Sequence, residues 1–141
     1  MTRRAILLTL AALRLRGADA AAQVWDVLTN MASALASGDA PGFLHDFDRN
    51  MKGFEGLATA VTGLLAETQI ESSIDPVENT GDDQNRTLEV TWSMRLISRS
   101  EIATVTQRQA TVTIRMARQR GKWRVVGLEP ESLFRPPSAR V

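Results

Sequence analysis

The residues best suited to acid–base chemistry in this chain of 141 residues are grouped in the segment His45-Asp46-Phe47-Asp48. A carboxylate in an apolar pocket can act as a general base, and histidine exchanges protons near neutral pH. The apolar spacing around the segment is helical, which puts Asp46 and Asp48 each about 100° from Phe47 on the helix. If Phe47 points into the core, one aspartate can reach the rim of a pocket, whereas His45 points toward solvent. These three residues are weak catalytic candidates, and a solvated helix face is the interpretation that we favour.

The same residues are poorly placed to bind a metal ion. Ligands on one helix face need a spacing of three or four residues, which His45, Asp46 and Asp48 do not have. Asp82 and Asp83 lie in a polar loop that lacks the alternating oxygen ligands of a dedicated calcium loop. The chain has no cysteine and one histidine, which excludes disulfides, thiolate nucleophiles and cysteine or histidine clusters for zinc. We therefore expect no metal site and no cofactor.

The segment from Val24 to Glu67 has the apolar spacing of three consecutive helices. The first helix is predicted to end near Ser37, where Gly38 suits the left-handed position after a helix. Asp39 then provides an N-cap, and a proline follows it in the first turn of a short second helix. That second helix carries the acid–base segment, and the third helix ends near Glu67.

From about residue 69 the period of the apolar residues changes from 3.6 to 2, which is typical of strands with one dry and one wet face. Strands are predicted at about residues 69–77, 88–96, 104–118 and 122–128. A proline and a polar loop put the first strand at a sheet edge. Because the single apolar face of such a sheet has to be covered, three helices followed by a four-stranded antiparallel meander indicate an α+β domain.

Three short stretches at characteristic places support a family resemblance. They are Ala34-Leu35-Ala36-Ser37-Gly38-Asp39 leading into Phe43-Leu44, the long strand around Trp92, and Gly121-Lys122-Trp123-Arg124-Val125-Val126. In order and spacing, residues 22–135 resemble the nuclear transport factor 2-like superfamily, which includes ketosteroid isomerases, polyketide cyclases and many secreted bacterial domains. The resemblance implies a cone-shaped α+β fold with three N-terminal helices packed on a curved antiparallel sheet of about four strands. This fold hosts unrelated functions.

The resemblance also implies a pocket between the helices and the dry face of the sheet. Such a pocket suits an apolar small molecule, although the same side chains could instead simply fill the core. The candidates for ligand binding are Phe47, Trp92, Met94, Ile114, Met116 and Trp123, with Phe43, Leu57 and Val125 beside them. Catalytic relatives place a tyrosine or another donor near the reacting oxygen, and this chain contains no tyrosine.

Two functional hypotheses follow from these residues. The leading one is a non-catalytic domain that binds a small apolar ligand or a protein partner. The alternative is an isomerase, cyclase or dehydratase that uses Asp46 or Asp48 as general base in an apolar pocket. A carboxylate or the histidine projecting into a cavity would favour the enzyme, whereas a filled cone would leave an interaction or structural module.

The N-terminus is predicted to direct export. Two arginines precede the nine-residue apolar run from Ala5 to Leu13, and small residues follow at Ala18–Ala22, which is the order of a signal peptide. A retained basic amphipathic helix is the alternative, because Arg14 and Arg16 lie after the apolar run. The apolar run is too short to span a bilayer. We therefore expect a signal peptide at residues 1–20, one domain at 21–135 and a tail at 136–141.

Charge is unevenly distributed along the chain. Residues 21–91 contain 12 acidic and 3 basic side chains, whereas residues 92–141 contain 3 acidic and 10 basic ones. One interpretation is an anion-binding wet sheet face, and the other is complementary charge between layers; the arginines concerned are Arg95, Arg108, Arg115 and Arg124. We expect no nucleic-acid binding, because no aromatic side chains are interleaved with these arginines. A homodimer could form through the polar face that carries Thr91, Ser93, Thr111 and Thr113.

Overall fold

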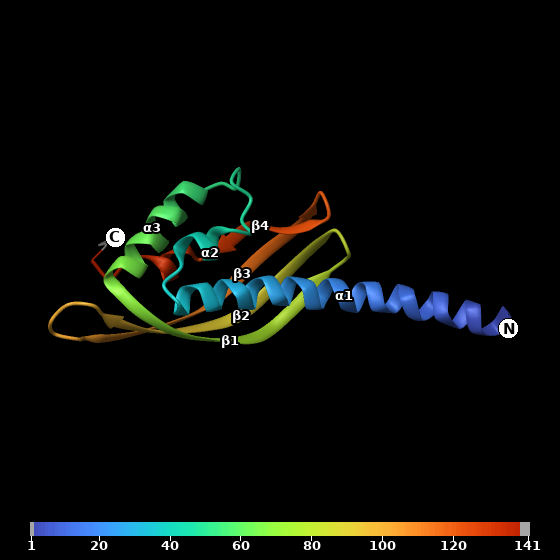
Figure 1. The fold of residues 1–141 in the computed structure, drawn as a ribbon, viewed down its shortest axis with the longest axis horizontal. Coiled ribbons are helices and arrows are strands. Elements are labelled where there is room, and N and C mark those ends of the chain that lie inside the picture. The colour runs from blue at the N-terminus through green and yellow to red at the C-terminus, as the bar shows by residue number, and fades with distance from the viewer. Residues whose placement is uncertain (1, 139–141) are drawn as a thin grey trace.

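The computed structural model describes residues 2–138, with side chains from residue 19 onward. Within that range the helices precede the strands, and a short 3-10 helix follows them (Figure 1). The helices are α1 (Thr2–Ala36), α2 (Ala40–Leu44) and α3 (Phe54–Glu67). The strands are β1 (Thr68–Gly81), β2 (Asn85–Ser98), β3 (Val105–Gln119) and β4 (Lys122–Glu129), and the 3-10 helix is η1 (Glu131–Phe134).

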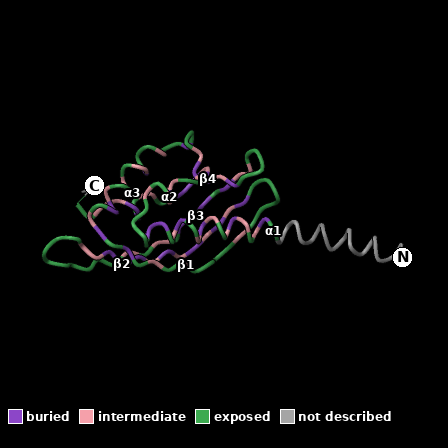
Figure 2. The backbone as a smooth tube through the Cα atoms, viewed as in Figure 1, coloured by how far each residue is buried: buried purple, intermediate pink, exposed green. Residues whose placement is uncertain are grey.

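The four strands form one antiparallel sheet in the order β1-β2-β3-β4. Alternate residues of β2 are buried, from Leu88 to Leu96, and the helices cover this inner face. On the opposite face, the residues of β2 and β3 are exposed or half-buried. Figure 2 shows that the tips of the strands are exposed. The prediction of three N-terminal helices packed on a curved antiparallel sheet of about four strands is confirmed.

The junction between α1 and α2 has the predicted capping residues. Gly38 has a φ of 74°, which lies in the left-handed region, and glycine adopts this region more readily than any other residue. The side chain of Asp39 accepts a hydrogen bond from the backbone N–H of Gly42 at 2.9 Å.

Helix α1 begins much earlier than the predicted first helix, and in Figure 1 its N-terminal half projects beyond the sheet. No helix in the described part of the chain is both long and apolar enough to cross a membrane.

The second helix is shorter than predicted, because it ends at Leu44. Phe47 instead forms a parallel bridge with Val125 on the free edge of β4. The backbone N–H of Asp48 donates to the carbonyl of Val125 at 2.9 Å, and that of Val125 donates to the carbonyl of Asp46 at 2.8 Å. An edge strand offers unpaired backbone groups, and pairing them outweighs continuing the helix here. The prediction that His45, Asp46 and Asp48 lie on a helix is therefore wrong.

The first strand is longer than predicted and includes the polar residues up to Gly81. Arg86 is buried opposite its end, and its guanidinium donates to the side-chain and backbone oxygens of Asn79. The carboxylate of Asp82 accepts hydrogen bonds from the backbone N–H groups of Gln84 and Asn85, which closes the hairpin. These polar groups form hydrogen bonds with one another within the hairpin, so they are compatible with a strand. The polarity of the segment therefore did not by itself indicate a loop.

The core fills the space between the helices and the inner face of the sheet. Phe43 from α2, Trp92 from β2 and Phe134 from η1 are all fully buried in it. The centroids of the Phe134 ring and the Trp92 indole are 5.1 Å apart, and those of Phe134 and Phe43 are 5.4 Å apart. Phe134 thus belongs to the core, although it follows the last strand of the sheet.

Candidate functional site

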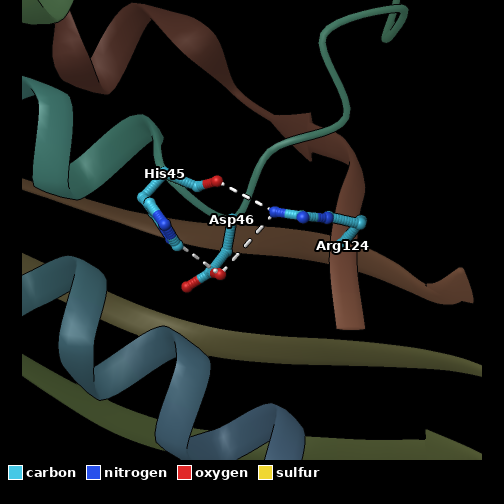
Figure 3. Close-up of polar contacts among 3 residues, drawn as sticks. All are labelled: His45, Asp46 and Arg124. Carbon is cyan, nitrogen blue, oxygen red and sulfur yellow. Dashed lines mark hydrogen bonds and ion pairs between the residues drawn. The ribbon is translucent and has the colours of Figure 1, made fainter. Parts of the chain in front are cut away.

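The first candidate cluster lies at the surface, where the turn after α2 meets β4 (Figure 3). Nδ1 of His45 is 3.2 Å from Oδ1 of Asp46, and Nη1 of Arg124 is 3.9 Å from the same oxygen. Arg124 also donates a hydrogen bond to the backbone carbonyl of His45 at 3.0 Å. The His45 side chain is 75% exposed. Asp46 thus lies between the imidazole of His45 and the guanidinium of Arg124 in contact with water, and the cluster attaches the turn to the strand.

Asp48 has a separate structural role beside this cluster. Its Oδ2 accepts a hydrogen bond from Nε2 of Gln119 at 3.1 Å, and its Oδ1 accepts one from the backbone N–H of Asn50 at 2.9 Å. The hydrogen bond from Gln119, followed by that from Asn50, lowers the pKa of Asp48 below its ordinary value. A general base for carbon acids needs a raised pKa, so this environment does not favour that chemistry.

The three catalytic candidates lie outside the principal pockets of residues 19–138. Five such pockets are formed by other side chains, and none of them is lined by His45, Asp46 or Asp48. The described residues also contain no group of three or more histidine, aspartate and glutamate side chains close enough to share a metal ion. The geometry of the three residues supports a turn attached to the edge of β4.

The six residues predicted to bind a ligand share one feature, which is burial. Each is at most 6% exposed, and together they form the inner layer of the core: Phe47, Trp92, Met94, Ile114, Met116 and Trp123. Of the six, only Met94 lines one of the five pockets, and that pocket lies on the solvent side of the sheet. Their burial places them in the core, and their role in binding stays a prediction.

Two of the three tryptophans differ in how their indole N–H groups are satisfied. Nε1 of Trp123 donates to Oε1 of Gln23 at 2.8 Å, and Arg118 donates to the same oxygen at 2.6 Å. Nε1 of Trp92 is buried and has no hydrogen-bond acceptor among the described residues. Nε of Arg118 is the other buried side-chain donor without an acceptor among the described residues, and such a donor costs about 1–3 kcal/mol.

Arg108 is not on the wet face, as we had expected, but on the inner face of the sheet. It pairs with Met94 in the register, two residues along β3 from Ala110, which faces Trp92. Its guanidinium donates to the backbone carbonyls of Leu133 and Arg135. Burial lowers the pKa of Arg108. In the sequence, Ala110 and Val112 alternate onto the dry face. One more step of the same alternation places Arg108 on that face, so its position could have been predicted.

The other three arginines each have an acidic partner. Arg95 lies 3.4 Å from Glu71, Arg115 lies 3.8 Å from Glu129, and Arg124 contacts Asp46 as described above. These contacts favour complementary charge over an anion-binding wet face. These partners have no local signal in the sequence, because they come from neighbouring strands and from the turn after α2.

Two of the pockets lie on opposite sides of the sheet. One has a volume of about 400 Å³ and lies between the end of α3 and the β2–β3 hairpin, with Leu96, Thr106 and Pro137 in its wall. The other, of about 580 Å³, is a groove on the solvent side that crosses β1, β2 and β3 at Glu71, Arg95 and Gln107. Both lie away from the three catalytic candidates.

Comparison with known proteins shows the fold. No protein-family model and no curated protein sequence matches the chain. A nuclear transport factor 2-like superfamily protein from Salmonella enterica has a similar structure, with a TM-score of 0.70, 11% identity and coverage of 88% of this chain and 96% of its own. A nuclear transport factor 2-like protein of unknown function from Shewanella oneidensis has a TM-score of 0.56, 12% identity and coverage of 75% and 93%. Aln2 from Streptomyces has a TM-score of 0.59, 16% identity and coverage of 76% and 85%. The chain has the nuclear transport factor 2-like fold.

Proposed function

We propose that the chain is a non-catalytic interaction domain that binds a protein partner through the outer face of its sheet, and that this partner is a second copy of the chain. The outer face is the side of β1, β2 and β3 away from the helices. Its residues are Glu71, Ser73, Thr91, Ser93, Arg95, Ile97, Val105, Gln107, Gln109, Thr111, Thr113 and Arg115. None of the helices in the described part of the chain covers this face (Figure 1).

An apolar pair at one end of the outer face carries the proposal, in which one member is exposed and the other, Ile97, is half-buried. Ile97 and Val105 are direct partners in the β2–β3 register, and Val105 is 47% exposed. Ile102, which is 78% exposed, lies in the hairpin that joins the two strands. Large exposed aliphatic side chains grouped beside a groove are typical of a surface that another protein covers.

Charge on the outer face favours a second copy as the partner. Arg95 and Glu71 lie side by side near the groove, and Arg115 contacts Glu129 toward the other end. A surface that carries both signs of charge can match itself about a two-fold axis, because each cation of one copy can meet an anion of the other. A partner of one strong charge would match only half of these groups.

The rest of the molecule supports a function without catalysis. The interior contains fully buried side chains such as Trp92 and Phe134, and the histidine and the two aspartates of the acid–base segment lie in a turn at the surface. An enzyme that uses Asp46 or Asp48 would need one of them in an apolar pocket. The surface therefore offers a better basis for function than the interior of this conformation.

Single cysteines can locate the interface, because the chain has no cysteine of its own. We would introduce Ser93→Cys, Thr111→Cys and Thr113→Cys one at a time and expose each variant to mild oxidation. At least one variant is expected to form a disulfide-linked dimer, whereas Thr62→Cys on the exposed side of α3 is the matched control and stays monomeric. Equal cross-linking of the control, or no cross-linking at any of the three positions, would contradict the proposal.

We also propose that the domain acts after export, as the N-terminal pattern predicts. The small residues at Ala18–Ala22 allow cleavage after Ala20 or after Ala22, and either would preserve Gln23 and its contacts with Arg118 and Trp123. Cleavage after Ala22 would remove the Ala21 carbonyl that accepts a hydrogen bond from Asn79. The intact mass of the protein recovered from the periplasm of a bacterial host tests this: residues 1–20 should be missing, and their retention would contradict export by cleavage.

A further inference from the structure

The hairpin that joins β3 to β4 is strongly basic. Residues 115–124 contain four arginines and one lysine, and no acidic side chain. Two of these cations, Arg120 and Lys122, lie at the tip of the hairpin and are exposed. Neither has an acidic side chain within ion-pair distance among residues 19–138. The tip of the hairpin therefore presents two positive charges to molecules outside the domain.

The side chains of this hairpin border a hollow of about 540 Å³. Its wall consists of Gln119, Arg120, Lys122 and Arg124, and no acidic residue of the described chain lines it. Gln119 and Lys122 are register partners, and Arg124 follows Lys122 on the same face of β4. Three cations and one amide thus surround one space. Arginine and lysine side chains that converge in this way are typical of a site for a phosphate group.

Arg120 has a backbone conformation that arginine rarely adopts. It is the one residue other than glycine among residues 19–138 with a positive φ, at 52°, and Gly121 follows it with a φ of 78°. A two-residue hairpin turn with two positive φ angles favours asparagine, aspartate or glycine at its first position. Arginine is unfavourable there, because its Cβ crowds the backbone. The residue therefore weakens the turn, whereas its exposed side chain adds a cation to the hollow.

Contacts with two other parts of the chain hold the hairpin in place. The backbone N–H of Arg118 donates to the carbonyl of Gln84, in the neighbouring β1–β2 turn, at 2.8 Å. The guanidinium of Arg124 donates to the carbonyl of His45, in the turn after α2, at 3.0 Å. Donors that are already positioned lose less conformational entropy when a ligand binds. The hollow is therefore suited to a ligand of defined geometry.

The surroundings of the hollow favour a compact anion over an extended anionic surface. Asp82 and Asp83 lie in the neighbouring β1–β2 turn, and Asp46 lies 3.9 Å from Arg124. A membrane or a nucleic acid would bring further phosphates close to these carboxylates, which repel them. A single phosphate group in the hollow meets the four residues of its wall. Two cations without an acidic partner match the two negative charges of a phosphate monoester.

We propose that the hollow at the β3–β4 hairpin binds the phosphate group of a small phosphate monoester. Arg120 and Lys122 provide the two positive charges. Arg124 retains further guanidinium N–H groups beyond its hydrogen bond to the turn after α2, and these donate to the phosphate oxygens. The hollow lies at the end of β3 opposite to Val105, so this site is additional to the interface on the outer face and does not depend on it.

The test uses phenyl phosphate at about pH 8, where it carries two charges, and benzenesulfonate, which has the same ring and one charge, as the control ligand. Chemical shifts of the backbone amides of residues 119–124 in the full chain report binding. Phenyl phosphate is expected to bind about tenfold more tightly. Lys122→Gln should weaken its binding about threefold, and Arg120→Asn with Lys122→Gln about tenfold. Lys52→Gln, which removes an exposed cation away from the hollow, should leave the affinity unchanged.

The single variant Arg120→Asn separates binding from folding. Because asparagine suits the turn better than arginine, this variant should melt at the same temperature as the unmodified chain or higher, while its affinity for phenyl phosphate falls about threefold. A loss of affinity in a variant that is at least as stable cannot come from a disturbed fold. It would support a direct contact between Arg120 and the ligand.

Vesicles of phosphatidylglycerol test a lipid headgroup as the source of the phosphate. The double variant should sediment with these vesicles to the same extent as the unmodified chain, because the hollow binds the monoester and not the membrane. Equal affinity for phenyl phosphate and benzenesulfonate, an affinity for phenyl phosphate that survives the double substitution, or a loss of vesicle binding in the double variant would each overturn the proposal.

Discussion

The side chains of Trp92 and Phe134 pack edge to face, with ring centroids 5.1 Å apart, although one lies in the middle of the sheet and the other follows its last strand. The contact means that the sheet and the helices do not complete the core by themselves. The chain has to return after β4 and insert Phe134 between Trp92 and Phe43. Residues beyond Pro130 are therefore part of the folded domain.

Replacing Phe134 should destabilise the fold strongly. Phe134→Ala removes a fully buried ring and leaves a cavity, so the free energy of unfolding is expected to fall by about 3–5 kcal/mol, and Phe134→Leu should cost less. Urea unfolding followed by tryptophan fluorescence measures both. Ile102→Ala, at a position 78% exposed, is the control and should change stability by less than about 0.5 kcal/mol. A loss below about 1 kcal/mol for Phe134→Ala would show that the segment is not part of the core.

Gln23 should be needed to satisfy two buried donors. Gln23→Ala leaves Nε1 of Trp123 and the guanidinium of Arg118 without their shared acceptor, so we expect a loss of about 1–3 kcal/mol in the free energy of unfolding. Gln23→Glu keeps an oxygen in place and adds a charge opposite Arg118, and it should retain most of the stability. Thermal unfolding of both variants decides this, and equal losses would contradict a role as acceptor.

Two glycines of α3 provide a matched pair. A Cβ at Gly56 meets nothing within 4 Å, whereas a Cβ at Gly63 would lie 3.3 Å from Cγ of Pro136. Because alanine favours helices, Gly56→Ala should stabilise the protein by up to about 1 kcal/mol. Gly63→Ala should gain less or destabilise, because Pro136 has to move. Identical gains in urea unfolding would mean that the C-terminal segment is not held against α3.

Asp82 should make the hairpin between β1 and β2 sensitive to acid. The backbone N–H groups of Asn85 and Gln84 lower the pKa of Asp82 below 3.8. A carboxylate with a lowered folded-state pKa stabilises the fold fully above its unfolded pKa, and this contribution is lost as the pH falls through the lower value. Asp82→Asn should therefore flatten the pH dependence of the melting temperature below about pH 4.

Asp83→Asn is the control for this measurement, since the Asp83 side chain makes no hydrogen bond to the described residues. It should leave the acid dependence as it is in the unmodified chain. If both variants flatten the curve equally, the effect comes from net charge and not from the turn.

Much of the fold could be predicted because its apolar patterns are local. The alternation from Leu88 to Leu96 indicated the inner face of β2, and Gly38 with Asp39 indicated where one helix ends and the next begins. Periodicity reports which side of an element is apolar, and a sheet with one apolar face requires helices to cover it. The fold class followed from those two facts.

The features that the sequence did not indicate depend on contacts between distant residues. The bridge between Phe47 and Val125 replaces a helical turn, and it forms only because the edge of β4 is free. Gln23 has no local signal as an acceptor for Trp123, which lies 100 residues away. Phe134 follows a proline in a stretch without any period, so nothing local marked it as core.

The mass of the full chain in solution tests the central claim most directly. Sedimentation equilibrium over a range of micromolar concentrations should give a reversible dimer with twice the chain mass of 15.5 kDa. Val105→Glu, which puts a charge beside Ile97 on the outer face, should shift the equilibrium to monomer. Val77→Glu, at another exposed valine away from that pair, should leave the dimer intact. A monomer at tens of micromolar, or a dimer that resists Val105→Glu, would contradict an interaction domain that pairs with itself through this face.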